Sequence, residues 1–380
     1  MTKFTLYNKD LPLGTIQVHR DIVNVIYYSD ILTRLFHSPL EWIIARATAC
    51  TRQNILDIFK VNNIHTVEQY LKATHGVAAT DTFWFKEENS NIKWSDVSVF
   101  DNNISKLIAN AAIDGVCLLG NANAKSPSPQ YQIAGTADKC IKRANGELVF
   151  YKTSGTVEFD MNTRPYMEVI VTQVAKQLGF ETPVTYNIIE KKLPTGHYRP
   201  YCYCTLVTDV NTGLIDYCDS KFNGMTVQEL LILFKTAGDK VSLVRLSEML
   251  ILDSLCLNID RHDANYAFTF DTNTLQYKNF SKSFDFDCAL GAFVGTNGVS
   301  VDTLYNKLMK IGSRMSIKNF NHLALAGMTK SIYNKLKAVK HITIDFSNMN
   351  GLTVSRKIFI EYALNRRLEE IITLVELRLN

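Results

Sequence analysis

The chain has 380 residues, of which 46% are hydrophobic and 21% are charged, and its formal net charge is +4. This composition is that of an ordinary globular protein with a sizeable core and about one to three domains. The charge is too small to indicate nucleic-acid binding, no stretch is long and apolar enough to span a membrane, and the first residues lack the apolar core of a signal peptide. We therefore expect a cytoplasmic protein without direct nucleic-acid or membrane contacts.

The eight cysteines are scattered through apolar runs, without the spacing of a disulfide framework or a zinc site. We expect all of them to be buried or half-buried thiols, in keeping with a reducing compartment.

The N-terminal part is predicted to be rich in strands up to about residue 40 and to contain two helical pieces over residues 41–60. A further helix is expected over residues 66–76, where Thr66 and Glu68 resemble a capped start and Gly76 a stop. Asp81, Trp84, Trp94 and Phe100 follow, and we interpret the aromatic residues mainly as packing anchors rather than a ligand cage.

Residues 121–130 are small, polar and proline-bearing, which indicates a linker or an exposed loop. The next loop contains Gly135, Thr136 and Lys139. A glycine lets backbone amides approach a phosphate and a lysine neutralises its charge, although this spacing alone is a weak signal. Two strands, 140–143 and 148–152, then flank an Asn-Gly hairpin turn.

A helix is predicted over residues 164–179, with Pro165 in its first turn and Gly179 at its end. Glu168 has two interpretations. Its carboxylate is favoured near the positive end of the helix dipole, or it forms an ion pair with Lys152 that holds the lysine toward phosphates. Lys152 could equally be a strand-end lysine that extends into water.

The remaining chain is predicted to contain two strands and then mostly helices, over residues 185–190, 201–208, 225–236, 243–257, 301–311, 320–338 and 354–379. The last helix carries Arg366, Arg367, Glu369 and Glu370, which we place on a solvated face.

The most informative stretch is 250–290, an apolar helix followed by a polar loop, two short strands and an acidic loop. Asp260 and Asn265 lie in the first loop, and Asp285 in the second. In phosphoryl transfer one carboxylate orients the attacking hydroxyl, while an amide and a second carboxylate hold Mg²⁺. Asp287 is the rival metal ligand. The alternative is that Asp260 and Asn265 only shape a turn.

The sequences IDRHDAN (259–265) and SFDFD (283–287) resemble the catalytic loop and the metal-binding step of HipA-like serine/threonine kinases, and the resemblance extends from about Trp42 to about Lys310. It implies an α+β, bilobal, protein-kinase-like fold that uses ATP and Mg²⁺. The expected parts are an accessory module (1–120), a strand-containing N-lobe (121–208) and a helical C-lobe (209–380).

The resemblance also implies roles for individual residues. Asp260 would be catalytic, with His262 bracing its loop, and Asn265 and Asp285 would bind metal, with Asp287 as the second choice. The nucleotide would be held by Gly135, Thr136, Lys139, Lys152 and Glu168, with a hinge for adenine between Cys204 and Thr208. A protein substrate and an antitoxin-like partner are further implications.

The chain departs from the best-known members at Gln132, where they have a serine. Regulation by phosphorylation at that point is therefore in doubt, although Ser126, Ser128 and Thr136 lie nearby.

Two alternative functions stay open, a nucleotide-binding regulatory protein with little transfer activity and a lipid kinase. No basic cluster or amphipathic surface helix favours the lipid kinase.

Overall fold

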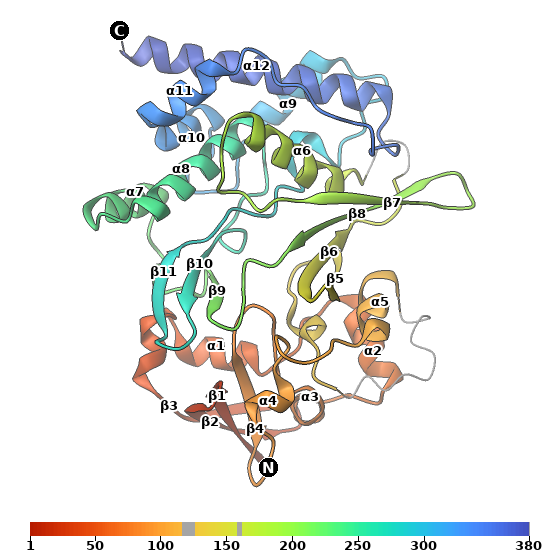
Figure 1. Ribbon diagram of the computed structural model, residues 1–380, viewed down its shortest axis with the longest axis vertical. Helices are drawn as coiled ribbons and strands as arrows, with labels where there is room; N and C mark the ends of the chain where they lie inside the picture. The colour runs from red at the N-terminus through yellow and green to blue at the C-terminus, as the bar shows by residue number, and fades with distance from the viewer. Residues whose placement is uncertain (116–125, 158–161, 380) are drawn as a thin grey trace. The chain divides into compact units, whose positions relative to one another are not determined.

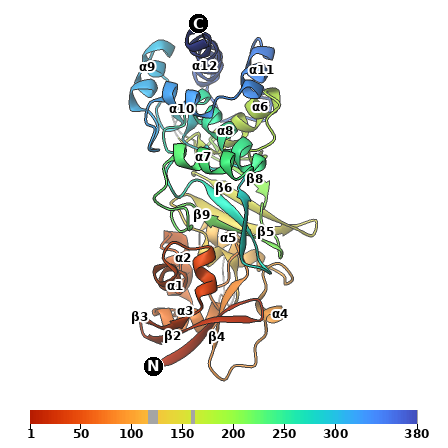
Figure 2. The same cartoon turned by 90° about the vertical axis from the view of Figure 1, so that its left-hand side faces the viewer.

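The computed structural model describes residues 1–115, 126–157 and 162–379, and the chain divides into two compact units. Unit 1 contains Met1–Lys152, Thr205–Asn223 and Phe268–Lys278, and unit 2 contains Thr153–Cys204, Gly224–Ala267 and Asn279–Asn380. Their elements are labelled in Figure 1 and, from the side, in Figure 2.

Unit 1 begins with an antiparallel sheet in the order β3-β2-β1-β4, which confirms the strand-rich start. Its strands are β1 (Thr2–Asn8), β2 (Leu11–His19), β3 (Ile22–Tyr28) and β4 (Phe83–Glu87). Helix α1 (Pro39–Arg46) packs against β3, and α3 (Val67–Thr74) packs against β2.

Helix α3 begins as the sequence predicted, but with a different partner for its cap. The Thr66 hydroxyl accepts a hydrogen bond from the Gln69 backbone N–H at 3.2 Å, and the Gln69 side chain accepts one from the Thr66 N–H at 3.2 Å. The reciprocal cap uses Gln69 instead of Glu68 because Gln69 is the third residue of the helix.

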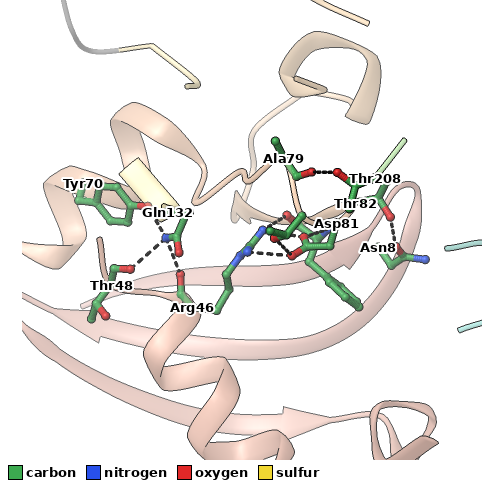
Figure 3. A network of polar contacts seen from close by, with 11 residues as sticks. Asn8, Arg46, Thr48, Tyr70, Ala79, Asp81, Thr82, Gln132 and Thr208 are labelled. Carbon is green, nitrogen blue, oxygen red and sulfur yellow. Dashed lines mark hydrogen bonds and ion pairs between the residues drawn. The ribbon is translucent and has the colours of Figure 1, made fainter. Parts of the chain in front are cut away.

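The aromatic residues after Asp81 pack as expected. Trp84 and Trp94 belong to one buried cluster, and Phe100 packs against it. Asp81 has a separate role, because its carboxylate accepts two hydrogen bonds from the Arg46 guanidinium, at 2.7 and 3.0 Å (Figure 3). Both side chains of this ion pair are buried.

Gln132 lies beside this ion pair in Figure 3. Its hydrogen bonds connect the segment before the Gly135 loop to the N-terminal helices. Its amide nitrogen lies 2.6 Å from the Tyr70 hydroxyl oxygen, 2.9 Å from the Thr48 carbonyl and 3.2 Å from the Arg46 carbonyl. The glutamine therefore has a packing role of its own at the position where the resemblance led us to look for a serine.

The hairpin predicted around Asn145-Gly146 is confirmed as β5 (Asp138–Ala144) and β6 (Glu147–Thr153). Asn145 and Gly146 have φ values of 50° and 84°, the left-handed conformations that a two-residue hairpin turn requires. Helix α5 (Lys106–Asp114) packs against β5 and against α2 (Gln53–Val61), and the short α4 spans Trp94–Val97.

Later segments of the chain join unit 1 through hydrogen bonds to its N-terminal part. The Thr208 hydroxyl donates to the Ala79 carbonyl at 2.6 Å (Figure 3), and the Asn8 amide donates to the Thr272 carbonyl at 2.7 Å. These segments contain most of a sheet with the order β11-β10-β9, formed by β9 (Thr212–Asp216), β10 (Ala267–Asp271) and β11 (Gln276–Phe280). The two compact units each combine several separate segments of the chain, so they do not test boundaries between consecutive domains. The expected boundaries at residues 120 and 208 stay a prediction.

Unit 2 contains α6 (Arg164–Gln177), the antiparallel pair β7 (Asn187–Lys192) and β8 (Tyr198–Thr205), and a helical array. The helices of the array are α7 (Val227–Thr236), α8 (Lys240–Leu255), α9 (Val301–Ile311), α10 (Phe320–Gly327), α11 (Lys330–Ala338) and α12 (Val354–Leu379). Helix α12 lies between α9 and α11 in Figure 2 and packs against both, while α8 packs against α7, α10 and α12.

Two expectations about this array are wrong. The helix predicted over 320–338 is two helices, because the chain is extended at Met328 and Thr329 caps the second helix through the Ile332 N–H at 3.2 Å. Arg367 is not on a solvated face. It is fully buried, and its guanidinium donates to the Ser254 hydroxyl at 2.9 Å and to the Asn321 side chain at 2.7 Å.

Seven of the eight cysteines lie in the described part of the chain, and all seven are buried or half-buried thiols, as expected. Cys117 lies outside the described residues. Among the described helices, none combines the length and the apolar character needed to cross a membrane.

Candidate active site

The loop that follows α8, residues 258–265, is folded back on itself by hydrogen bonds among its own residues. The Asn265 N–H donates to the His262 carbonyl at 2.8 Å, and the Asn265 amide nitrogen donates to the Asp260 carbonyl at 2.9 Å. The half-buried His262 accepts at Nδ1 from the Ala264 N–H at 3.3 Å, a contact within the loop. Asn265 therefore does shape the turn, and its Oδ1 is the atom of this side chain that does not donate in these bonds.

Arg261 connects this loop to α8 and to the acidic loop. Its guanidinium donates to both carboxylate oxygens of Asp253, at 2.8 and 3.0 Å, and both side chains are fully buried. The same guanidinium donates to the Asn265 carbonyl and, at 2.5 Å, to the Phe284 carbonyl. It also lies 4.6 Å from the centre of the Phe286 ring. One buried cation thus links the backbones next to Asn265 and Asp285.

Three carboxylates from α6 and the acidic loop converge in unit 2. Ligand oxygens of Glu168, Asp285 and Asp287 all lie within 4.8 Å of one another. The Glu168 carboxylate also accepts a hydrogen bond from the Phe286 N–H at 2.9 Å. Asp285 adopts a φ of 61°, a left-handed conformation that is uncommon for a residue with a side chain and is often found at functional sites.

Glu168 does not have the helix-dipole role that was one of its two interpretations. Helix α6 begins at Arg164, so Glu168 lies beyond the first turn, where the dipole effect has decayed. Its side chain is 1% exposed. The expected ion pair with Lys152 joins the two units and stays a prediction.

Arg164 neutralises part of this negative charge, since its guanidinium lies 2.8 Å from Asp287 Oδ2. Burial alone lowers the pKa of Arg164, but the Asp287 carboxylate and its hydrogen bond outweigh that effect and raise the pKa, so the arginine is charged. The Asp285 carboxylate also raises the pKa of Arg164, so this arginine acts on two of the three clustered carboxylates. A bound cation would reduce the repulsion that remains between them.

The cluster fits Mg²⁺ in its chemistry and approximately in its size. All of its donors are hard carboxylate oxygens, which Mg²⁺ prefers. Ligands on opposite sides of Mg²⁺ lie about 4.2 Å apart, since each bond is about 2.1 Å long. A spread of up to 4.8 Å therefore needs only a small adjustment of the side chains.

Asp260 is half-buried and has two close neighbours in unit 2. Its Oδ1 lies 2.6 Å from Arg314 Nη1, and its Oδ2 lies 3.7 Å from the Cys288 thiol. Burial raises the pKa of the Cys288 thiol, so the sulfur stays protonated and donates to the carboxylate. The candidate base is thus held by an arginine that is 66% exposed in its side chain.

The nucleotide residues Gly135, Thr136, Lys139 and Lys152 all lie in unit 1. Gly135 and Thr136 are exposed, and Lys139 Nζ donates to the Ala134 carbonyl at 2.8 Å. Gly135 has a φ of 89°, a conformation that favours glycine, and a Cβ there would lie 2.6 Å from Lys139 Nζ, so the lysine tip would have to move. The exposed Gly135 backbone and the nearby Lys139 ammonium are the kinds of group that bind a phosphate.

Lys152 is 5% exposed, so the interpretation of a strand-end lysine reaching into water is wrong. A buried ammonium is costly unless its charge is compensated, which makes this lysine a stronger candidate than its sequence position indicated.

Sequence reasoning missed Arg164, Arg261, Cys288 and Arg314 as parts of the site. Arg261 is part of the IDRHDAN motif, and an arginine next to a candidate base could have indicated a buried side chain that holds the loop in place. The contacts of Arg164 and Arg314 join residues that are far apart in the chain, so no local pattern marked them.

No protein-family model and no curated protein matches the sequence. Among solved structures, one match is a Shewanella oneidensis MR-1 toxin–antitoxin structure of HipA, HipB and operator DNA, with 12% identity, a TM-score of 0.50 and 99% of both chains covered. Another is the Helicobacter pylori proinflammatory kinase CtkA, with 15% identity and a TM-score of 0.41 over 63% of this chain and 93% of that chain. The full-length match shows that this chain has a HipA-like, protein-kinase-like α+β fold, which confirms the expected fold class.

Proposed function

We propose that this protein is a kinase that transfers the γ-phosphoryl group of ATP to a serine or threonine of a protein substrate. The observation that carries the proposal is the buried Arg261, which links the loop of Asp260 and Asn265 to the loop of Asp285. A turn-forming loop alone would not need a fully buried cation to connect it to a second acidic loop.

When bound, ATP with Mg²⁺ supplies the phosphoryl group and the positive charge that stabilises its transfer. Asp260 orients the acceptor hydroxyl and receives its proton late in the transfer. His262 braces the loop around it. Asn265 and Asp285 would hold the cation. Asp287 and Glu168 are the other two carboxylates of the cluster that contains Asp285.

The residues of unit 1 would bind the nucleotide. Gly135 and Thr136 offer backbone amides to the phosphates, and Lys139 and Lys152 provide positive charge. Glu168 would keep Lys152 directed toward the phosphates. We place the adenine hinge between Cys204 and Thr208.

A second candidate is a nucleotide-binding regulatory protein with little transfer activity. The contact of Asp260 with Arg314 and Cys288 favours it, since both oxygens of the candidate base are engaged. An exposed arginine contact is weak, however, and a substrate can displace it. We therefore rank the active kinase first.

The two candidates are separated by incubating the purified protein with γ-labelled ATP, Mg²⁺ and a generic protein acceptor. The kinase incorporates label into serine or threonine, and incorporation stops in EDTA. A protein that binds ATP but incorporates no label under any metal condition has the regulatory function instead. A label found in phospholipid and absent from protein would indicate the lipid kinase.

An antitoxin-like protein partner and a cytoplasmic location complete the proposal. The similar structure from Shewanella oneidensis contains HipA together with HipB and operator DNA, and that is the support for a partner of this kind. Co-purification with the product of a neighbouring reading frame tests it.

A further inference from the structure

We propose that the loop of residues 312–318, the cationic loop, selects acceptor serines or threonines that lie beside acidic residues. This inference rests on the proposed kinase function and specifies its substrate class. The cationic loop follows α9, and its Arg314 contacts the candidate base Asp260 directly.

The cationic loop is held in a defined conformation. Ser313, Met315 and Ile317 are buried, whereas Arg314, Ser316 and Lys318 alternate with them and are exposed. The Ser313 N–H donates to the Lys318 carbonyl at 2.8 Å and closes the loop. The buried residues anchor the backbone, so the two cations are presented together on its solvent side.

Glycine is required where the cationic loop begins. Gly312 has a φ of 71°, and a Cβ there would collide with the Lys318 carbonyl. The tight closure brings the Lys318 backbone next to Gly312 and Ser313, the two residues that precede Arg314.

The chain around this loop carries charge of one sign. Between Asp302 and Asp345 the sequence has no acidic residue, and its exposed cations nearest to Arg314 are Lys307, Lys310 and Lys318. Each of the last two is four residues from Arg314 and so lies within about 14 Å of it along the chain. Exposed cations next to a candidate catalytic carboxylate attract a ligand of the opposite charge.

The contact between Arg314 and Asp260 explains how such a ligand would also prepare the site. An exposed ion pair is weak and screened, so a carboxylate of the acceptor can replace Asp260 as the partner of Arg314. An arginine can bind that carboxylate with two hydrogen bonds. Asp260 Oδ1 is then released to accept the proton of the neighbouring hydroxyl.

The test measures peptide binding to the full chain without nucleotide, by fluorescence anisotropy at low salt. The probes are short fluorescent peptides with a central serine flanked by glutamates, by glutamines or by lysines. We expect the glutamate peptide to bind at least about tenfold more tightly than the glutamine peptide, because several charge pairs form together. Arg314→Ala and Lys318→Ala should each weaken its binding by about fivefold, the upper value for one exposed pair.

Lys330→Ala is the matched control. Lys330 is an exposed lysine at the first position of α11, in the same acid-free stretch but outside the cationic loop, and its loss should leave binding unchanged. Equal binding of the glutamate and glutamine peptides would overturn the proposal, as would equal losses in Arg314→Ala and Lys330→Ala. A single-stranded oligonucleotide that binds more tightly than the glutamate peptide, and depends on Arg314, would show that the surface serves nucleic acid instead.

The same peptides separate this inference from the proposed function. Selective binding of the glutamate peptide without any phosphate transfer would refute the kinase and leave the surface standing. Phosphate transfer at equal rates to the glutamate and glutamine peptides would establish the kinase and refute the acidic selection.

Discussion

The Glu168 carboxylate accepts a hydrogen bond from the Phe286 N–H at 2.9 Å, between the two aspartates of the acidic loop. A residue of α6 therefore holds the backbone that positions Asp285 and Asp287, and its own oxygens belong to the same carboxylate cluster. Glu168 has both a structural and an electrostatic role, and these two roles can be separated by substitution.

Glu168→Ala removes both roles, whereas Glu168→Gln keeps an oxygen that can accept from the Phe286 N–H. Leaving that buried N–H without an acceptor costs about 1–3 kcal/mol, so the alanine variant should unfold at lower denaturant concentration than the glutamine variant. Both variants should lose transfer activity, because both remove the charge. Equal stability of the two variants would show that the hydrogen bond to Phe286 contributes nothing.

Lys152→Ala should weaken nucleotide binding as well as transfer, because it removes a positive charge proposed to contact the phosphates. Glu168→Gln should mainly reduce transfer. Lys60→Ala, which removes an exposed lysine of α2, is the control for a general loss of charge. ATP affinity from calorimetry and turnover from label incorporation are compared. Wild-type values for both site variants would remove the pair from the mechanism.

ATP binding should depend on Mg²⁺, because the proposed site would hold a cation firmly only when phosphate oxygens complete its shell. Calorimetry in Mg²⁺ and in EDTA measures this. Asp285→Asn should abolish the difference between the two conditions. If Asp287→Asn abolishes it and Asp285→Asn does not, the two aspartates exchange roles. Equal ATP affinity of the wild-type protein in EDTA and in Mg²⁺ is the result that contradicts the metal site.

Arg261→Ala should lower the free energy of unfolding by about 3–5 kcal/mol, because it leaves the buried Asp253 carboxylate without its partner. Arg366→Ala is the control, since Arg366 is a third exposed and its ion pairs with Asp302 and Glu370 should contribute less than about 1 kcal/mol each. Chemical denaturation of both variants tests the contrast. If both variants lost similar amounts of unfolding free energy, the buried contacts of Arg261 would contribute no more than an exposed ion pair.

The sequence predicts those parts of the fold that depend on local patterns. Helix α9 begins and ends at the expected residues. The turn at Asn145-Gly146 also forms as expected, because these two residues tolerate the left-handed backbone that the turn needs. The break between α10 and α11 was missed, since the apolar spacing continues across Met328 and only the cap at Thr329 marks the new start.

The sequence also identifies the loops of the candidate site but not the contacts between them. Glu168 and Phe286 are 118 residues apart, and Arg314 and Asp260 are 54 apart, so each contact depends on the packing of unit 2 as a whole. Charge was misleading for Arg367. A pattern of charged residues on a helix does not tell which of them face buried acceptors such as Ser254.

Asp260 is the proposed catalytic base, and the decisive measurement is label incorporation from γ-labelled ATP by the Asp260→Asn variant. Asparagine keeps an oxygen that can accept from Arg314, so the variant should keep its fold and nearly all of its ATP affinity. Autophosphorylation and transfer to a generic protein acceptor should both fall by at least about a hundredfold, the lower contribution of a positioned base. Undiminished incorporation would refute this role and leave the loop of residues 259–265 as a turn without a catalytic function.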